Sequence, residues 1–352
     1  MSDTAGLDRI DRAVINAFQG GFPVTERPFE PAAATLRDRG VDVTAAELLD
    51  RVRTLDDAGT LTRFGTLINA AEIGGTATLV AMHAPEDRFD EIKQLVNDHR
   101  EVAHNYRREH PHLNMWFVVS VADPDAVDRV LGEIEAETGQ ETYNLPKQQE
   151  FRVEAKFLVD GPIADGDVDR SGLGPAVERT GRETLTPEER DLVVEIQDGL
   201  PVTATPYADV AERLDVDTEW VLRTIKRFNA EGKVRRVGVI PNHYALGYTE
   251  NGMTVWNVPD DLLDTVGPEI ASLPFVTHCY ERPRHESVWP YNFFAMTHGR
   301  SEAESEQRIQ RVKAVMDEHW DVGDDDWDTL FSTEILKKTG IRLGERAEAN
   351  TQ

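Results

Sequence analysis

The chain has 352 residues, which corresponds to about two to three domains, and each half is long enough to bury its own core. It carries 38 Lys and Arg residues against 65 Asp and Glu, a formal net charge of −27. This spread acidity argues against a basic nucleic-acid-binding face and is typical of a salt-adapted, carboxylate-coated surface. The single cysteine excludes a disulfide framework, and no apolar run approaches the roughly 18 residues of a membrane span, so we expect a cytoplasmic protein without a membrane segment.

The sequence repeats itself once. Residues 21–29 read GFPVTERPF, and residues 199–207 read GLPVTATPY. The segment HNYRR at 104–108 returns as HCYER at 278–282, an offset of 174 residues. This offset is far longer than the roughly 20–50 residues of a solenoid repeat, so we expect two homologous halves.

In chain order, the first half predicts a winged helix-turn-helix at residues 1–70. Its helices are expected over about 7–18, over about 30–38 and from Thr44 to Gly59, before a short hairpin through Arg63-Phe64. Residues 71–158 then predict strands at 75–83, 102–108, 115–122 and 151–158, with amphipathic helices at about 86–99 and 124–138. The order β-α-β-β-α-β is that of a ferredoxin-like domain.

A linker separates the halves, since residues 159–184 are rich in Gly, Asp and Pro and lack apolar periodicity. Thr186-Pro187-Glu188-Glu189 then predicts a helix N-terminus with a capping box. A second winged helix-turn-helix is expected at 185–243, with helices near 192–200 and 206–213, a third from Asp217 to Gly232 and a hairpin through Arg235-Arg236. The second ferredoxin-like domain, 244–340, has strands near 251–258, 275–281, 291–297 and 329–335, helices near 260–272 and 302–318, and a tail at 341–352. The expected fold class is α+β, in two tandem copies.

A winged helix-turn-helix joined to a ferredoxin-like domain resembles the Lrp/AsnC regulators. The chain resembles the siroheme decarboxylases more closely, through RVGVIPNHYALGY at 236–248, RPRH at 282–285 and WPYN at 289–292, which look like the beta-type subunit. The first half, with HNYR at 104–107 and Trp116-Phe117, looks like the alpha-type subunit. In that family the two types usually form a heterodimer. The resemblance therefore implies a fused pair that forms a pseudo-twofold dimer within one chain, with further homo-oligomerisation left open.

The resemblance also implies a reaction. Siroheme loses the carboxyl groups of its C12 and C18 acetate side chains as carbon dioxide, which gives 12,18-didecarboxysiroheme in haem biosynthesis by the alternative route or in haem d1 biosynthesis. No separate cofactor and no intrinsic metal are implied, because the iron tetrapyrrole is the substrate.

Several residue types suit this substrate. Arg282 and Arg284 are expected to pair with siroheme carboxylates, and Trp289 and Tyr291 to contact its flat face. His278 or His285 is expected to supply the proton for the new methyl group, and axial ligation of the substrate iron by one of them is an open alternative. The other expected substrate contacts are Tyr280, Asn292, Arg236, His243, His104, Tyr106, Arg107 and Arg63.

Each of these residues also has a purely structural interpretation. His104 and His278 occupy equivalent strand positions, which a shared fold would explain as well as a shared ligand. The tyrosines could pack in a core, and Arg63 and Arg236 could belong to a wing that once faced DNA. His110 and His112 lie on a first-half loop that is either solvated or functional. Because Arg284-His285 and Trp289-Pro290-Tyr291 occur only in the second half, the main pocket is expected there.

Two other functions remain open. The first is a tandem Lrp/AsnC-type transcriptional regulator that senses haem or another small ligand, and the second is a haem-binding chaperone or sensor. Residues 44–57, the first presumed recognition helix, are net acidic, which disfavours contact with DNA phosphates. We therefore expect siroheme as the partner and no nucleic acid.

Overall fold

The structure, a computed structural model, describes residues 6–163, 185–285 and 287–338. Within these ranges the chain forms two compact units, one from residues 6–75 and 156–247 and the other from 76–155 and 248–338. Each unit therefore combines matching parts of both sequence halves. Most of the predicted linker (164–184) and the predicted tail (341–352) lie outside the described residues. In the described part of the chain, no helix is long and apolar enough to cross a membrane.

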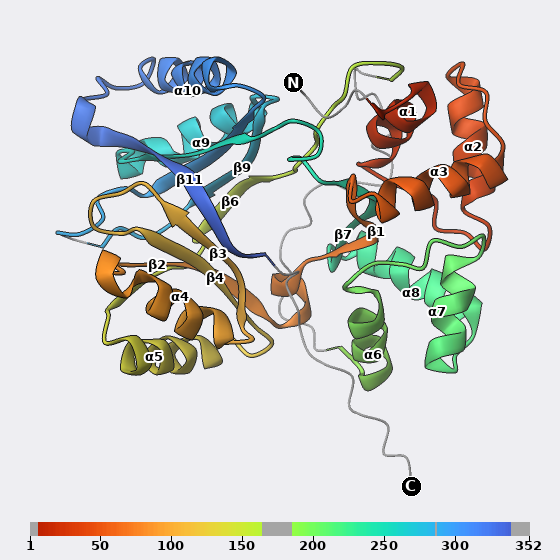
Figure 1. The fold of residues 1–352 in the computed structure, drawn as a ribbon, viewed down its shortest axis with the longest axis horizontal. Coiled ribbons are helices and arrows are strands. Elements are labelled where there is room, and N and C mark those ends of the chain that lie inside the picture. Colours follow the sequence, from red (N-terminus) through yellow and green to blue (C-terminus); the bar gives the residue numbers. More distant parts are fainter. Residues whose placement is uncertain (1–5, 164–184, 286, 339–352) are drawn as a thin grey trace, which may run out of the picture. The chain divides into compact units, whose positions relative to one another are not determined.

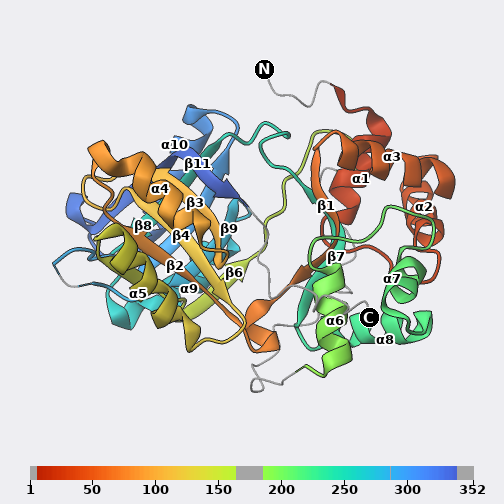
Figure 2. The ribbon, with the colours of Figure 1, turned by 60° about the horizontal axis from the view of Figure 1, so that its bottom comes forward.

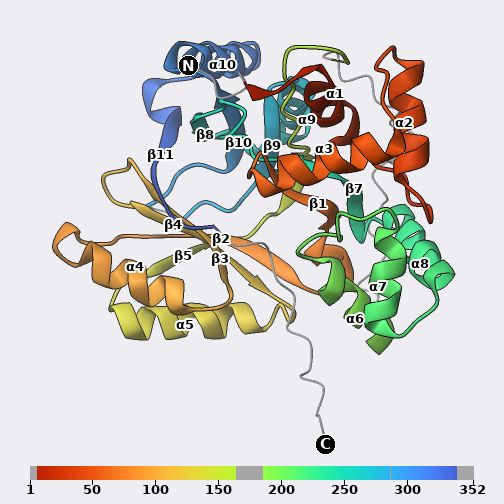
Figure 3. The same ribbon diagram turned by 45° about the vertical axis from the view of Figure 1, so that its right-hand side comes forward.

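The first unit pairs two copies of three helices and a strand (Figures 1 and 3). The first copy has α1 (Arg9–Phe18), α2 (Phe29–Asp38), α3 (Ala45–Asp57), β1 (Leu61–Ile68) and the 3-10 turn η2 (Ala70–Ile73). The second copy has α6 (Pro187–Ile196), α7 (Pro206–Leu214), α8 (Thr218–Ala230) and β7 (Val234–Pro241). The predicted capping box is confirmed, since Thr186 accepts from Glu189 N and the Glu189 side chain accepts from Thr186 N.

The predicted hairpin in each wing is wrong. Each copy supplies a single strand, and β1 pairs antiparallel with β7, so that Gly65 faces Gly238. The two strands pass too close to the other copy's helix ends for a side chain. A Cβ on Gly65 would lie 2.6 Å from Leu200 N, and a Cβ on Gly238 would lie 2.5 Å from Phe18 O. The glycines at the centre of each strand therefore permit a ribbon shared between the copies, in place of two local hairpins.

The second unit contains two copies of the predicted β-α-β-β-α-β order. The first copy has β2 (Thr76–Met82), η3 (Glu86–Arg88), α4 (Phe89–Asp98), β3 (Val102–Arg108), β4 (Met115–Val121), α5 (Ala126–Thr138), β5 (Thr142–Leu145) and β6 (Gln149–Val153). The second has β8 (Glu250–Trp256), η5 (Asp260–Leu262), α9 (Leu263–Ser272), β9 (Val276–Glu281), β10 (Phe293–Gly299), α10 (Glu302–Met316), η6 (Asp324–Asp326) and β11 (Trp327–Lys338). The strands follow the order β5-β2-β4-β3-β11-β8-β10-β9-β6.

The last strand of each copy is exchanged between the copies. Residues 327–331 of β11 pair with β8 of their own copy, and residues 332–338 pair with β3 of the other. The first copy does the same with two short strands, because β5 pairs with β2 and β6 pairs with β9. The predicted strand at 151–158 is therefore wrong in its bounds. Residues 157–159 instead pair with the side-chain amides of Asn16 and Gln19 at the end of α1.

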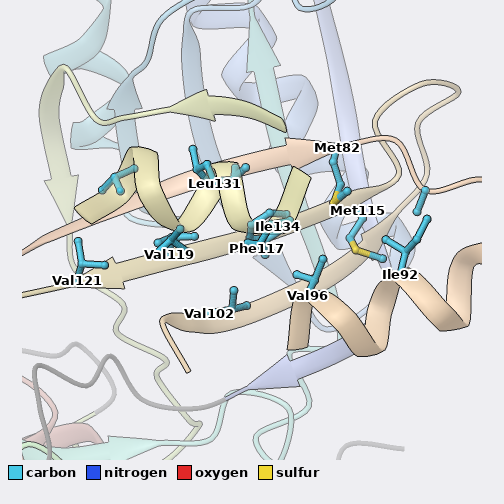
Figure 4. Close-up of a cluster of buried hydrophobic side chains, with 14 of the residues drawn as sticks. Met82, Ile92, Val96, Val102, Met115, Phe117, Val119, Val121, Leu131 and Ile134 are labelled. Atoms are coloured by element: carbon cyan, nitrogen blue, oxygen red, sulfur yellow. The ribbon is translucent and has the colours of Figure 1, made fainter. Parts of the chain in front are cut away.

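The helices cover one face of these strands (Figure 2). In the first copy α4 and α5 pack on β2–β4 through Met82, Ile92, Met115, Phe117 and Ile134, as Figure 4 shows. Side chains alternate along a strand, so the neighbouring Ala81 and Trp116 point to the opposite face. There they join Leu145, Met253, Val255, Trp289, Phe294 and Leu330 in one cluster from both copies. This shared core fixes the strands that carry the repeated motif.

Candidate functional site

The repeated segment lies on two equivalent strands, β3 and β9. His104, Tyr106 and Arg108 on β3 correspond to His278 and Tyr280 on β9 and to Arg282 directly after it. Both strands carry a β-bulge at the same place, between Val102 and His104 and between Val276 and His278. Val276 and Cys279 belong to the helix-side core, so the bulge turns His278 and Tyr280 to the helix-free face.

Arg282 is a largely buried cation. Its guanidinium lies 5.0 Å from the Tyr280 ring centroid and 5.6 Å from that of Phe294, and Nη1 donates to the Leu145 carbonyl. Burial lowers the pKa of Arg282 to about 10, so the side chain stays protonated at neutral pH. Its Nε is buried without a hydrogen-bond partner, and no carboxylate among the described residues pairs with it. A buried cation without a counter-charge is costly, which favours an anionic ligand at this place.

Arg108 is the first-copy counterpart of Arg282. Its guanidinium lies 5.4 Å from the Tyr106 ring centroid, and Nη1 donates to the Leu330 carbonyl at 2.7 Å. The sequence predicts a substrate contact at the neighbouring Arg107. Arg107 contacts the Phe89 ring at 4.3 Å and forms an ion pair with Glu86 at 2.6 Å. The shared H-x-Y-x-R spacing, at the common offset of 174 residues, was the signal that identifies Arg108.

Arg284 and Asn292 hold the loop after β9 in place. Each nitrogen of Arg284 has a protein partner: Nε donates to Asn257 Oδ1 and Pro290 O, Nη1 to Asp260 Oδ1 and Nη2 to Val258 O. Asn292 is buried, and its amide pairs with the backbone of Val258 in both directions. In the first copy Asn114 pairs with the backbone of Ala84 in the same way. These contacts give both residues a structural role in this loop.

His285, Trp289 and Tyr291 extend from the same loop onto the first copy. His285 Nε2 lies 2.8 Å from the carbonyl oxygen of Asn144, and its ring contacts Tyr143 at 5.4 Å. Trp289 is fully buried, with its ring centroid 4.9 Å from that of Trp116 and 5.0 Å from that of Tyr291. The Trp289 Nε1–H has no partner among the described residues. Burial and the carboxylate of Asp328 raise the pKa of Tyr291.

The ring of His278 is hydrogen-bonded to the hydroxyl of Thr277. Its Nδ1 lies 2.9 Å from Thr277 Oγ1, and its ring centroid lies 6.1 Å from that of Tyr280. His104 stacks beside Tyr106, with the centroids 6.3 Å apart. The second copy thus places His278 and Tyr280 on one face of β9, with Arg282, which has no carboxylate partner among the described residues, directly after the strand.

Three predicted residues belong to the winged-helix unit. Arg63 Nη1 donates to Gln197 O at 2.6 Å, and burial lowers its pKa. Arg236 is buried on β7. His243 stacks on Phe157, with the centroids 5.1 Å apart. The predicted residues thus divide between the two compact units.

A hollow of about 640 Å³ lies beside β3, and residues of both copies line it. It is lined by His83, Glu86, Arg107, Arg108, Glu109, His110, Pro111, Asn114, Thr333 and Glu334. Three carboxylates offset its two arginines, which suits a polyanion poorly. His110 Nδ1 accepts from Leu113 N at 2.8 Å, and burial lowers the pKa of its ring. No cluster of potential metal ligands occurs among the described residues.

Comparison with known proteins gives matches to both units. The siroheme decarboxylase NirDL-like HTH domain matches residues 11–61 and 189–235, and the AsnC-like ligand binding domain matches 72–152 and 245–337. The siroheme decarboxylase NirDL subunit of Paracoccus pantotrophus is 30% identical over 341 residues, which cover 97% of this chain and 99% of that subunit. The chain belongs to the siroheme decarboxylase family.

Shorter relatives match about half of the chain. The NirG subunit of the siroheme decarboxylase of Paracoccus pantotrophus is 48% identical over 145 residues, 41% of this chain and 88% of that subunit. The crystal structure of NirDL with an iron-uroporphyrin III analogue shares the fold, with a TM-score of 0.68 at 23% identity, over 96% of this chain and 94% of that one. The predicted family, α+β fold class and subunit-like halves are confirmed.

Proposed function

We propose that the chain is a carboxy-lyase that converts siroheme to 12,18-didecarboxysiroheme, with iron tetrapyrrole as substrate and no separate cofactor. The full-length likeness to NirDL supports the reaction. The observation that carries it is Arg282, a partly buried cation whose Nε is buried and which has no carboxylate partner among the described residues. Siroheme is rich in carboxylates, which a planar guanidinium binds well.

The side chains on β9 and directly after it then have distinct roles. Arg282 binds a substrate carboxylate through its unpaired Nε–H, and Tyr280 provides an apolar wall with a polar tip. The C–C bond to the departing carbon dioxide breaks, and its electron pair enters the macrocycle. His278 then gives a proton to the new methyl carbon. His285 remains the alternative donor, and axial binding of the substrate iron by either histidine remains the alternative role.

The second copy holds the main pocket, and the first copy supports it. The loop at residues 283–291 in the second copy is longer than its first-copy counterpart at 109–113. This longer loop places Trp289 and Tyr291 beside the shared core. Arg284 and Asn292 fix this loop, so their contribution to substrate binding is indirect. We also propose that the domains have the boundaries that the sequence predicts, that the protein is cytoplasmic, and that it has no nucleic-acid partner.

Anaerobic incubation with siroheme tests the function directly. Mass spectrometry is expected to detect loss of two molecules of carbon dioxide per siroheme. A double variant, His278→Ala with His285→Ala, is expected to bind siroheme and to release no carbon dioxide from it. If the double variant keeps wild-type turnover, neither histidine is the proton donor.

The regulator hypothesis makes the opposite prediction. Both arginines of α3 are paired with acids: Arg51 with Asp8 at 2.7 Å, and Arg53 with Asp50 at 2.9 Å. Arg227 on α8 pairs with Glu189. Siroheme left unchanged, together with a shift of a promoter fragment in a gel, would favour the regulator.

A further inference from the structure

A chain of buried hydrogen bonds leads away from His278. Thr277 Oγ1 lies 2.9 Å from His278 Nδ1 and 3.0 Å from His298 Nε2. His298 Nδ1 lies 2.5 Å from Asn251 Oδ1. Thr277, His298 and Asn251 are all buried, at 4%, 7% and 9% exposure, so each bond forms away from bulk water. The residues come from three neighbouring strands, β9, β10 and β8.

The direction of each hydrogen bond in this series follows from its last acceptor, Asn251 Oδ1. An amide oxygen only accepts, so Asn251 Oδ1 receives the proton on His298 Nδ1. In neutral His298 the other nitrogen, Nε2, then carries the lone pair and accepts from the Thr277 hydroxyl. The Thr277 hydroxyl has one proton, and His298 Nε2 at 3.0 Å is a closer acceptor for it than the Met296 carbonyl oxygen at 3.5 Å. With that proton given to His298, the hydroxyl oxygen accepts from His278 Nδ1–H. His278 is therefore held as the Nδ1–H tautomer, and Nε2 is the ring nitrogen that transfers the proton or binds the substrate iron.

The first copy has His104 in place of His278 but lacks the other three residues of this hydrogen-bonded chain. The same register positions hold Ala77 in place of Asn251, Ala103 in place of Thr277 and Ser120 in place of His298. The Ser120 hydroxyl has no hydrogen-bond partner among the described residues. The histidine, tyrosine and arginine of the motif occur in both copies, whereas the residues that fix the ring of His278 occur in one.

We propose that Thr277, His298 and Asn251 are positioning residues that hold His278 in the Nδ1–H tautomer and make the second copy the reactive one. This inference rests on the proposed role of His278 in siroheme decarboxylation. When the imidazolium form of His278 gives its Nε2 proton to carbon, it becomes the Nδ1–H tautomer. This is the tautomer that the hydrogen bonds to Thr277, His298 and Asn251 stabilise. The same state suits iron ligation, since a ligating histidine commonly donates its other N–H to a neighbouring acceptor.

Variants of Thr277 test the positioning role. Thr277→Val keeps the shape and removes the hydroxyl, and siroheme turnover is expected to fall about 10-fold or more. Thr277→Ser restores the hydroxyl and is expected to recover most of the loss. Ser120→Ala, at the first-copy position that matches His298, is the control and is expected to keep wild-type turnover. Thermal melts of all three variants identify any that fail to fold.

Nitrogen NMR of histidine-labelled protein gives a readout that packing alone would not change. The His278 signals, assigned by their loss in His278→Gln, are expected to show Nδ1 protonated in the wild type and in Thr277→Ser, with the tautomers mixed in Thr277→Val. An Nε2–H tautomer in the wild type, or wild-type turnover in Thr277→Val, overturns the inference.

Failure of the inference is distinguishable from failure of the function. An active wild type with an equally active Thr277→Val keeps the decarboxylase and removes the positioning role. An inactive wild type removes the decarboxylase, and with it the catalytic part of the inference, whatever tautomer the NMR spectrum reports.

Discussion

At the scale of single residues, comparison of the two copies shows which side chains both share and which occur in one copy only. The H-x-Y-x-R motif was readable from the sequence because both copies keep one offset. The structural role of Asn292 was not, because the longer second loop shifts its match with Asn114 to an offset of 178 residues. The hydrogen bonds of Arg284 likewise depend on Val258 and Asp260, whose proximity only the fold creates. The residue type shows that a side chain can bind a carboxylate. The fold determines whether that side chain already has hydrogen-bond partners within the protein.

Arg282 should matter for substrate more than for stability. In Arg282→Met the apolar stem is kept and the buried charge is removed, so the melting temperature is expected to stay the same or rise. Siroheme affinity is expected to fall about 10- to 100-fold, the equivalent of about 1.5–3 kcal/mol for a charge-assisted hydrogen bond. Titration of siroheme followed by its absorbance measures this. Arg108→Met is the matched first-copy control, and an equal loss of affinity there would contradict a second-copy site.

At the scale of helices and strands, local sequence patterns predicted where the elements lie but not which strands pair with each other. Capping residues and apolar spacing located the helices, including the one that begins at Pro187. The pairings β1·β7, β3·β11 and β6·β9 join strands that are distant in the chain. No local pattern distinguishes a strand that pairs within its own copy from one that pairs with the other, since both bury the same faces.

The ribbon of β1 and β7 should depend on its central glycines. In Gly238→Ala the new Cβ would meet Phe18 O at 2.5 Å, a backbone atom that cannot rotate away. The free energy of unfolding is expected to fall by about 1–3 kcal/mol, as for other overpacked sites. Denaturant unfolding followed by circular dichroism measures it. Gly21→Ala is the control, because nothing lies within 4 Å of the added atom, and an equal loss there would argue against the close approach.

At the scale of the whole molecule, the acidic surface implies a dependence on salt. A net charge of −27 destabilises a compact state through self-repulsion. Raising the ionic strength from about 0.1 M to about 1 M shortens the Debye length from about 10 Å to about 3 Å, so the melting temperature is expected to rise. Neutralising the exposed pair in Asp324→Asn, Asp325→Asn should reduce the slope of melting temperature against salt. A melting temperature that is independent of salt would contradict a salt-adapted surface.

Each half of the chain should need the other half in order to fold. Each compact unit draws strands from both halves, and the shared core places Trp116 and Leu145 of the first half against Trp289 and Leu330 of the second. A half alone would expose this apolar face and leave β3 or β9 without its exchanged partner. Residues 1–163 and 185–352, produced as separate chains, are therefore expected to aggregate singly and to copurify as a one-to-one complex when coexpressed. Size-exclusion chromatography with light scattering measures the stoichiometry. A half that is monomeric and shows cooperative unfolding by itself would mean that strand exchange does not hold the halves together.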